Sequence, residues 1–168
     1  MQNLEAKFKL SDLAKARGKA ESLGYDFKAA LRQRDTFFRV PRGKLKLRED
    51  ESGACLIHYD RRASDDLKLS SYEIMPIEDP EAMRAILTAA LGVLAEVRKE
   101  RTLLTKANVR LHLDSVDGLG AFGEIEAVLD QGADGERSRA DVDDLLAALE
   151  VRRTNLIGVS YADMLRPV

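Results

Sequence analysis

Residues 109–126 read VRLHLDSVDGLGAFGEIE, and this stretch decides the fold class. Charged residues alternate with apolar ones before the Asp117-Gly118 pair, and Glu124 and Glu126 flank Ile125 after it. A period of two places charged side chains on one face of a strand and apolar side chains on the other. Asp and Gly together are typical of a turn. The stretch therefore predicts two strands, each with one charged face and one apolar face.

The same alternation recurs along the chain. It is clearest at residues 4–10, 44–48 and 109–114, and further strands are expected at 27–40, 54–62, 69–75, 97–104 and 122–130, which makes eight. Isolated helices interrupt these strands, a pattern typical of a mostly antiparallel sheet or barrel. The predicted class is α+β, with an eight-stranded antiparallel barrel and helices packed outside. Neither a linker nor a repeat divides the sequence, so residues 1–168 are expected to form one domain.

Three segments carry the signals of helices. Ser11 is placed to cap the first, which ends at Gly24. Asp79 and Pro80 open the second, and Gly92 follows its last turn. The third is expected to begin at Ser138 and to bury the apolar residues that recur at helical spacing, Val142, Leu145, Leu146 and Leu149.

Composition excludes several classes of protein. The chain has 168 residues, 45% of them hydrophobic, and a net charge of −2, which argues against a partner such as nucleic acid or a membrane surface. Its single cysteine, Cys55, excludes an internal disulfide and a cysteine-based zinc site. No signal-like segment and no run of about 18 apolar residues is present, so a cytoplasmic protein is expected.

The small net charge conceals a gradient. Residues 1–62 carry 15 Lys and Arg against 9 Asp and Glu, whereas residues 112–168 carry 5 against 12. Two halves of opposite charge attract each other, or they form an anion-binding surface and a cation-binding surface.

The charged strand faces allow two interpretations. They face water on an open sheet, or they line the inside of a closed barrel. Like charges across neighbouring strands repel, so a solvated face usually mixes signs. Here Lys44, Lys46 and Arg48 share one face. Converging cations of this kind suit a polyanion such as a triphosphate, and the carboxylates of Glu124 and Glu126, about 7 Å apart, suit Mg²⁺ or Mn²⁺.

Several motifs together resemble the CYTH domain, the triphosphate tunnel metalloenzyme superfamily. They follow the order of that family over nearly the whole chain: Asn3-Leu4-Glu5-Ala6-Lys7, Asp35-Thr36-Phe37-Phe38, Lys44-Leu45-Lys46-Leu47-Arg48-Glu49, Leu56-Ile57-His58-Tyr59-Asp60-Arg61, Val97-Arg98-Lys99-Glu100-Arg101, Val109 to Asp114, Gly118-Leu119-Gly120, Phe122 to Glu126 and Ser160 to Leu165.

The resemblance implies a tunnel, open at both ends, that takes in a triphosphate and two divalent metal ions, Mg²⁺ or Mn²⁺. The catalytic residues it implies are Glu5, Lys7, Glu124 and Glu126, and the metal ligands are Glu5, Asp114, Glu124 and Glu126. The implied triphosphate-binding residues are Lys7, Lys9, Lys44, Lys46, Arg48, Arg61, Lys99, Arg101 and Arg110. Asn3 stands where the family has its first acidic residue. His112, in phase with Arg110, is either a ligand or a hydrogen-bonded residue of the lumen, and Ser160 and Tyr161 are expected to form a structural latch.

Three functions remain open at this point. The first is metal-dependent hydrolysis of a triphosphate such as tripolyphosphate, ATP or thiamine triphosphate. The second is a class IV-type adenylate cyclase that makes cyclic AMP and pyrophosphate, and the third is a module that binds a polyphosphate or nucleotide without turnover. The strand around Asp35 lacks the tyrosine expected in the thiamine triphosphatase branch. Members of the family are often homodimers, although the sequence shows no exposed apolar stripe that argues for one.

Overall fold

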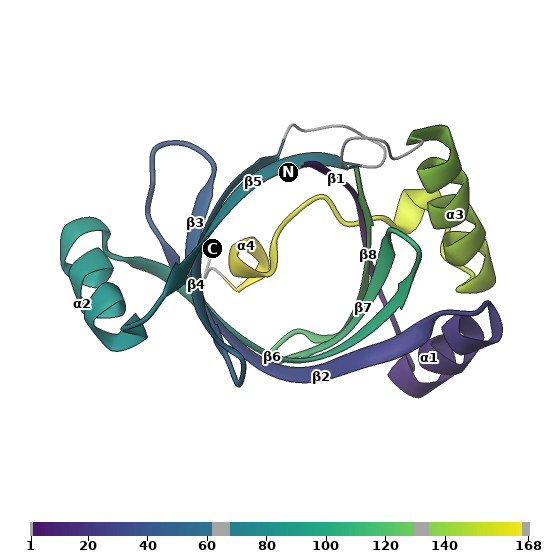
Figure 1. Ribbon diagram of the computed structural model, residues 1–168, viewed down its shortest axis with the longest axis horizontal. Helices are drawn as coiled ribbons and strands as arrows, with labels where there is room; N and C mark the ends of the chain where they lie inside the picture. The colour runs from purple at the N-terminus through teal and green to yellow at the C-terminus, as the bar shows by residue number, and fades with distance from the viewer. Residues whose placement is uncertain (1, 62–67, 130–134, 166–168) are drawn as a thin grey trace.

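Eight antiparallel strands close into a barrel in the computed structural model, which describes residues 2–61, 68–129 and 135–165 (Figure 1). The strands are β1 (Gln2–Lys9), β2 (Asp26–Phe38), β3 (Lys44–Asp50), β4 (Gly53–Arg61), β5 (Lys68–Ile77), β6 (Val93–Lys106), β7 (Val109–Val116) and β8 (Gly120–Val128). The helices are α1 (Leu13–Ser22), α2 (Pro80–Leu91), α3 (Gly135–Ala148) and α4 (Tyr161–Met164), with a 3₁₀ turn at Arg153–Asn155. The predicted class and the eight strands are confirmed.

The barrel closes because β1 pairs with both β5 and β8. The order around it is β1-β5-β4-β3-β2-β6-β7-β8. Glu5 lies opposite Glu126 and Lys7 lies opposite Glu124 across β1 and β8. Since side chains alternate between the two faces of a strand, this register puts the predicted charged faces inside the barrel and the apolar faces outside.

The helices α1 and α3 cover the apolar outside of β1, β7 and β8. Ala16 and Ala20 of α1 are buried there together with Val142, Leu145 and Leu146 of α3. Within this layer Phe8 lies so close to Gly123 that a Cβ added to the glycine would stand 2.3 Å from the ring. Only glycine therefore fits at this point of β8 without a shift of the core.

The helix boundaries differ from expectation at two starts. Asp12, not Ser11, caps α1, and its carboxylate accepts a hydrogen bond of 3.0 Å from the Lys15 amide. Likewise α3 begins before Ser138, which is buried within the helix and bonded to Asn108 at 2.9 Å. By contrast, Asp79 caps α2 as predicted, with a bond of 2.9 Å from the Ala82 amide.

The short helix α4 lies inside the barrel (Figure 1). Tyr161 and Ala162 pack there against inward-facing apolar residues of the strands, among them Phe37, Val97 and Phe122. Ser160 caps α4 through a reciprocal pair of bonds with Asp163, so the predicted latch is a helix seated in the lumen. Helix α4 therefore fills part of the lumen.

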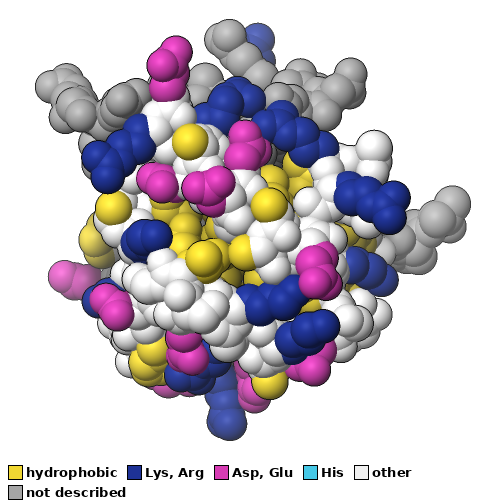
Figure 2. Space-filling model, turned by 90° about the vertical axis from the view of Figure 1, so that its right-hand side faces the viewer, with side chains coloured by type: hydrophobic (Ala, Val, Ile, Leu, Met, Phe, Trp, Pro, Cys, Tyr) yellow, Lys and Arg dark blue, Asp and Glu magenta, His cyan; other side chains and the backbone are white. Residues whose placement is uncertain are grey.

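The face over α1 and α3 carries charges of both signs side by side, as Figure 2 shows. Exposed pairs such as Arg153 with Asp143 at 2.8 Å and Lys19 with Glu150 at 3.0 Å contribute to it. Much of the acidic charge of the C-terminal part thus lies on a solvated helix face. Among the residues described, no helix is both long enough and apolar enough to cross a membrane.

Candidate functional site

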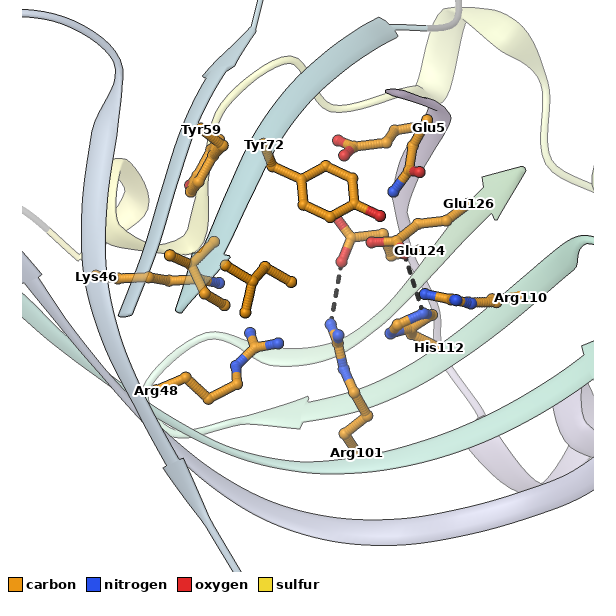
Figure 3. Close-up of a pocket in the computed structure, with 13 residues that line it drawn as sticks. Glu5, Lys46, Arg48, Tyr59, Tyr72, Arg101, Arg110, His112, Glu124 and Glu126 are labelled. Atoms are coloured by element: carbon orange, nitrogen blue, oxygen red, sulfur yellow. Dashed lines mark hydrogen bonds and ion pairs between the residues drawn. The ribbon is translucent and has the colours of Figure 1, made fainter. Parts of the chain in front are cut away.

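A cavity of about 180 Å³ lies inside the barrel (Figure 3). Seven of the eight strands contribute side chains to it, which explains why no single segment of the sequence reveals it. Its lining consists of Asn3, Glu5, Lys46, Arg48, Ile57, Tyr59, Tyr72, Ile74, Arg101, Arg110, His112, Glu124 and Glu126.

Three cations surround the buried carboxylate of Asp35. We call Asp35, Lys46, Arg48 and Lys99 the Asp35 cluster. Arg48 donates two hydrogen bonds of 2.7 Å to the carboxylate, and the ammonium groups of Lys46 and Lys99 lie 3.1 and 2.9 Å from its Oδ2. Burial alone raises the pKa of Asp35, but Arg48, Lys46 and Lys99 together lower it well below its usual value. One anion therefore holds three cations in place around it.

The two lysines of this cluster are close to losing their charge. Burial, together with the neighbouring Arg48, lowers the pKa of Lys46 to about 8. Burial lowers the pKa of Lys99 to about 7, although Asp35 acts in the opposite direction. An added anion would stabilise the charged form of both. The cluster is thus arranged to accept more negative charge than Asp35 supplies.

Arg101 joins two further carboxylates. It donates bonds of 2.7 and 2.6 Å to Asp114 and a third, of 3.0 Å, to Glu124. The hydroxyl of Tyr161 also donates to Asp114, at 2.9 Å. Asp114, expected as a metal ligand, is fully buried by these partners and lies outside the cavity lining.

A histidine and two carboxylates face the cavity from β7 and β8. Ligand atoms of His112, Glu124 and Glu126 all lie within 4.8 Å of one another, and we call these three the His112 cluster. Glu5 of β1 lies opposite Glu126 in the sheet and lines the same cavity. Lys7 lies 3.3 Å from Glu124, and its ammonium stands 4.1 Å from the centre of the Tyr161 ring.

This donor set fits a divalent cation. In the described part of the chain, neither ring nitrogen of the buried His112 makes a hydrogen bond, and the side-chain oxygen of Asn3 makes none either. Burial, together with Arg101, lowers the pKa of His112 to about 4, so its imidazole is neutral at pH 7 and offers a lone pair. Buried polar atoms rarely stay without a partner. Carboxylates suit Mg²⁺ and Mn²⁺ and imidazole suits softer ions such as Zn²⁺, so the set admits a divalent cation without choosing one.

Among the described side chains, four of the predicted phosphate-binding residues do not line the cavity: Lys7, Lys9, Lys44 and Lys99. Lys44 pairs with Asp163 of α4, and Lys9 is exposed, 5.6 Å from the ring of Phe122. Lys99 reaches the site only through Asp35. The side chain of Arg61 lies outside the described residues.

Sequence reasoning missed the role of Asp35 as a counter-ion and the inward position of Tyr72 and Ile74. Asp35 stood in the sequence only as part of a family motif, because its partners lie on other strands. By contrast, period two in the stretch after residue 68 could have placed Tyr72 and Ile74 on one face. Cys55 is half-buried and packs against the interior apolar residues.

Comparison with known proteins agrees with this architecture. "Putative adenylate cyclase MJ0240" of Methanocaldococcus jannaschii is 29% identical over 174 residues, which covers 98% of each chain. The solved structure of PH1012 from Pyrococcus horikoshii matches with a TM-score of 0.86 at 20% identity, over 98% of this chain and 99% of that one. HpAC1 from Hippeastrum, described as a putative adenylyl cyclase with a dominant triphosphatase activity, matches with a TM-score of 0.69 at 15% identity, over 98% and 94% of the two chains.

The family assignment rests on a match across the barrel. The CYTH domain model matches residues 1–161, from β1 to the start of α4. That range holds all the residues that line the cavity. The chain therefore belongs to the CYTH domain family.

Proposed function

We propose that this protein hydrolyses a triphosphate in the barrel cavity with the help of a divalent cation. The observation that carries the proposal is that one cavity joins the cations Lys46, Arg48 and Arg101 to the His112 cluster. A polyanion and a metal cation would thus meet in the same space. Phosphoryl transfer needs little beyond such positioning and charge neutralisation.

The cations would hold the phosphate groups. Lys46 and Arg48 come from β3, Arg101 from β6 and Arg110 from β7, so they reach the cavity from different sides. A hydrogen bond to a charged group contributes about 1.5 to 3 kcal/mol. Because Asp35 and Asp114 already fix the two guanidinium groups, little side-chain freedom is lost when a phosphate binds.

The His112 cluster would hold the metal, with Glu5 and Asn3 beside it. When bound there, a divalent cation neutralises charge on phosphate oxygens and acts as a Lewis acid. Glu126 and Glu5 come from strands that pair directly, so their carboxylates approach the cavity together. Lys7 and Arg101 both contact Glu124 and so fix its position.

Two similar proteins point to different reactions, one to hydrolysis and the other to cyclisation. HpAC1 shares the fold and is described by a dominant triphosphatase activity. The M. jannaschii relative carries the name of an adenylate cyclase, so cyclisation of ATP to cyclic AMP and pyrophosphate is the second candidate. Both reactions use the same charged residues. The preferred metal, the cytoplasmic location and the homodimer stay predictions.

Product analysis tests the proposal. Purified protein is incubated with tripolyphosphate, ATP or thiamine triphosphate and Mg²⁺ or Mn²⁺, and orthophosphate and cyclic AMP are measured. We expect orthophosphate, and we expect Glu126→Gln to lower kcat about 1000-fold because a metal ligand is lost.

The matched control is Glu100→Gln, which removes an exposed carboxylate on the outer face of β6 and should leave kcat unchanged. Cyclic AMP without orthophosphate would identify a cyclase instead. Tight binding of tripolyphosphate without any turnover would identify a binding module.

A further inference from the structure

One side of the cavity is apolar and aromatic. Ile57 and Tyr59 of β4 lie directly opposite Ile74 and Tyr72 of β5, and all four side chains line the cavity. We call these four residues the apolar wall. Figure 3 shows the Tyr72 ring at the cavity, with its hydroxyl toward the carboxylates of Glu124 and Glu126.

The inner half of the apolar wall has a structural role. Ile57 and Tyr59 are buried and pack in the same cluster as Tyr161 of α4. The ammonium of Lys46 lies 5.7 Å from the centre of the Tyr59 ring, so this ring also faces a cation of the Asp35 cluster. Packing around α4 therefore accounts for these two residues.

The outer half is not explained in this way. Ile74 is 48% exposed although it lines the cavity, and it belongs to neither apolar cluster of the described residues. Tyr72 is half-buried and packs against the inner cluster with only part of its surface. An isoleucine that keeps half of its surface in water inside a charged barrel gains stability only when something apolar covers it.

A bare triphosphate cannot cover this surface. Phosphate oxygens are charged and strongly hydrated, so they gain nothing against the apolar surface of isoleucine. A ring joined to the triphosphate would place apolar area on Ile74 and an aromatic face against Tyr72. Stacking of a base on an aromatic side chain tolerates many ring types.

We propose that Tyr72 and Ile74 bind an aromatic ring of the substrate, so that the natural substrate is an organic triphosphate and not inorganic tripolyphosphate. This inference rests on the proposed function of the same cavity and adds its substrate class. Tyr72 and Ile74 are two residues apart on one strand, and one ring would contact both.

The strand itself provides a matched control. Met75 follows Ile74 and is 53% exposed, but it points to the outer face of β5 because successive side chains alternate. Ile74→Ser and Met75→Ser therefore remove similar exposed apolar surface on opposite sides of the barrel wall. Tyr72→Ser removes the ring, and Tyr72→Phe keeps the ring but removes the hydroxyl.

The experiment compares kcat/KM for ATP, thiamine triphosphate and tripolyphosphate in the wild type and the four variants, with the same metal. We expect Ile74→Ser and Tyr72→Ser to lower kcat/KM about tenfold for at least one of the two ring-bearing substrates and to leave tripolyphosphate within about twofold. Met75→Ser should match the wild type with every substrate, and Tyr72→Phe should keep the wild-type ratio between the ring-bearing substrates and tripolyphosphate.

An equal loss for tripolyphosphate would overturn the inference, since it would show that the variants disturb the phosphate site. No loss for either ring-bearing substrate would overturn it as well, and so would a full loss in Tyr72→Phe, which would assign the effect to the hydroxyl. If the wild type hydrolyses no triphosphate, the proposed function fails, and calorimetric affinities for the same ligands and variants then test the apolar wall by itself.

Discussion

The Asp35 cluster and the His112 cluster lie in the same barrel, but their charged groups differ in how closely they pair with one another. In the Asp35 cluster all four side chains contact one another through a single carboxylate, with distances of 2.7 to 3.1 Å. The His112 cluster is looser: His112 Nε2 lies 3.5 Å from Glu126, and neither ring nitrogen has a hydrogen bond within the described residues.

The difference indicates what each cluster contributes. The Asp35 cluster holds its shape without a ligand, because Asp35 already neutralises part of the positive charge. The His112 cluster keeps lone pairs and carboxylate oxygens at one place, which is the condition for binding a cation. Removal of a carboxylate should therefore affect folding in the first cluster and chemistry in the second.

Asp35→Asn should have the largest effect, a loss of folding stability. The amide keeps the size of the side chain but leaves the buried Lys99 and the partly buried Lys46 and Arg48 without their shared anion, so we expect the free energy of unfolding to fall by about 3 to 5 kcal/mol. Urea denaturation followed by circular dichroism measures this loss. Glu126→Gln serves as the counterpart and should change the same quantity by less than about 1 kcal/mol.

Tripolyphosphate added without metal should restore much of the stability of Asp35→Asn, because it replaces the missing anion. A stable Asp35→Asn protein would show that the cations do not depend on Asp35.

Lys46→Ala should have a smaller effect, on substrate binding. Lys46 lines the cavity and contributes one of its cations, so we expect KM for a triphosphate to rise about 10- to 30-fold with kcat within about threefold. Steady-state kinetics at saturating metal measures both constants. A fall in kcat with KM unchanged would contradict a role in binding.

The smallest effect expected is a pH dependence of binding. The pKa of Lys46 is lowered to about 8 and that of Lys99 to about 7, and only the charged form of each attracts phosphate. Above these values the lysines lose their proton in the free protein and must regain it when a triphosphate binds. KM should therefore rise at least tenfold between pH 7.5 and 9, less steeply between pH 6 and 7.5, and should be nearly constant below about pH 6.

Lys46→Arg separates this effect from other titrations, since arginine stays charged throughout the range. Its KM should rise less steeply than that of the wild type. Identical profiles would exclude Lys46 as the titrating group.

Most of the fold could be predicted from local patterns, because a period of two identifies a strand and its two faces without knowledge of its neighbours. Asp79, Pro80 and Gly92 likewise fixed α2 through contacts within a few residues. Period two alone left open whether the charged faces of β1, β3, β7 and β8 meet water or the lumen, and the like charges on one face favoured the lumen. The cavity lining, which includes Glu5, Arg110 and Glu126, confirms the lumen for these residues.

The missed features depend on contacts between distant parts of the chain. Asp35 meets Lys99, and Lys44 meets Asp163, across separations that no local period encodes. The helix α4 has four residues, too few for a periodic signal, and lies inside the barrel because the strand residues around it are apolar. Contacts of this kind also determine where Lys44 and Asp114 lie, because Lys44 pairs with Asp163 and Asp114 pairs with Arg101 and Tyr161.

The closure of the barrel also bears on how the chain folds. Asn3 of β1 lies opposite Val128 of β8, so the first strand cannot complete its ladder until nearly all of the chain is available. Pairing over such long separations closes a large loop, and the entropic cost of closure precedes the stabilising contacts. Domains of this kind fold in milliseconds to seconds, not microseconds. During synthesis, the edge of β1 that pairs with β8 therefore stays unpaired until β8 has been made.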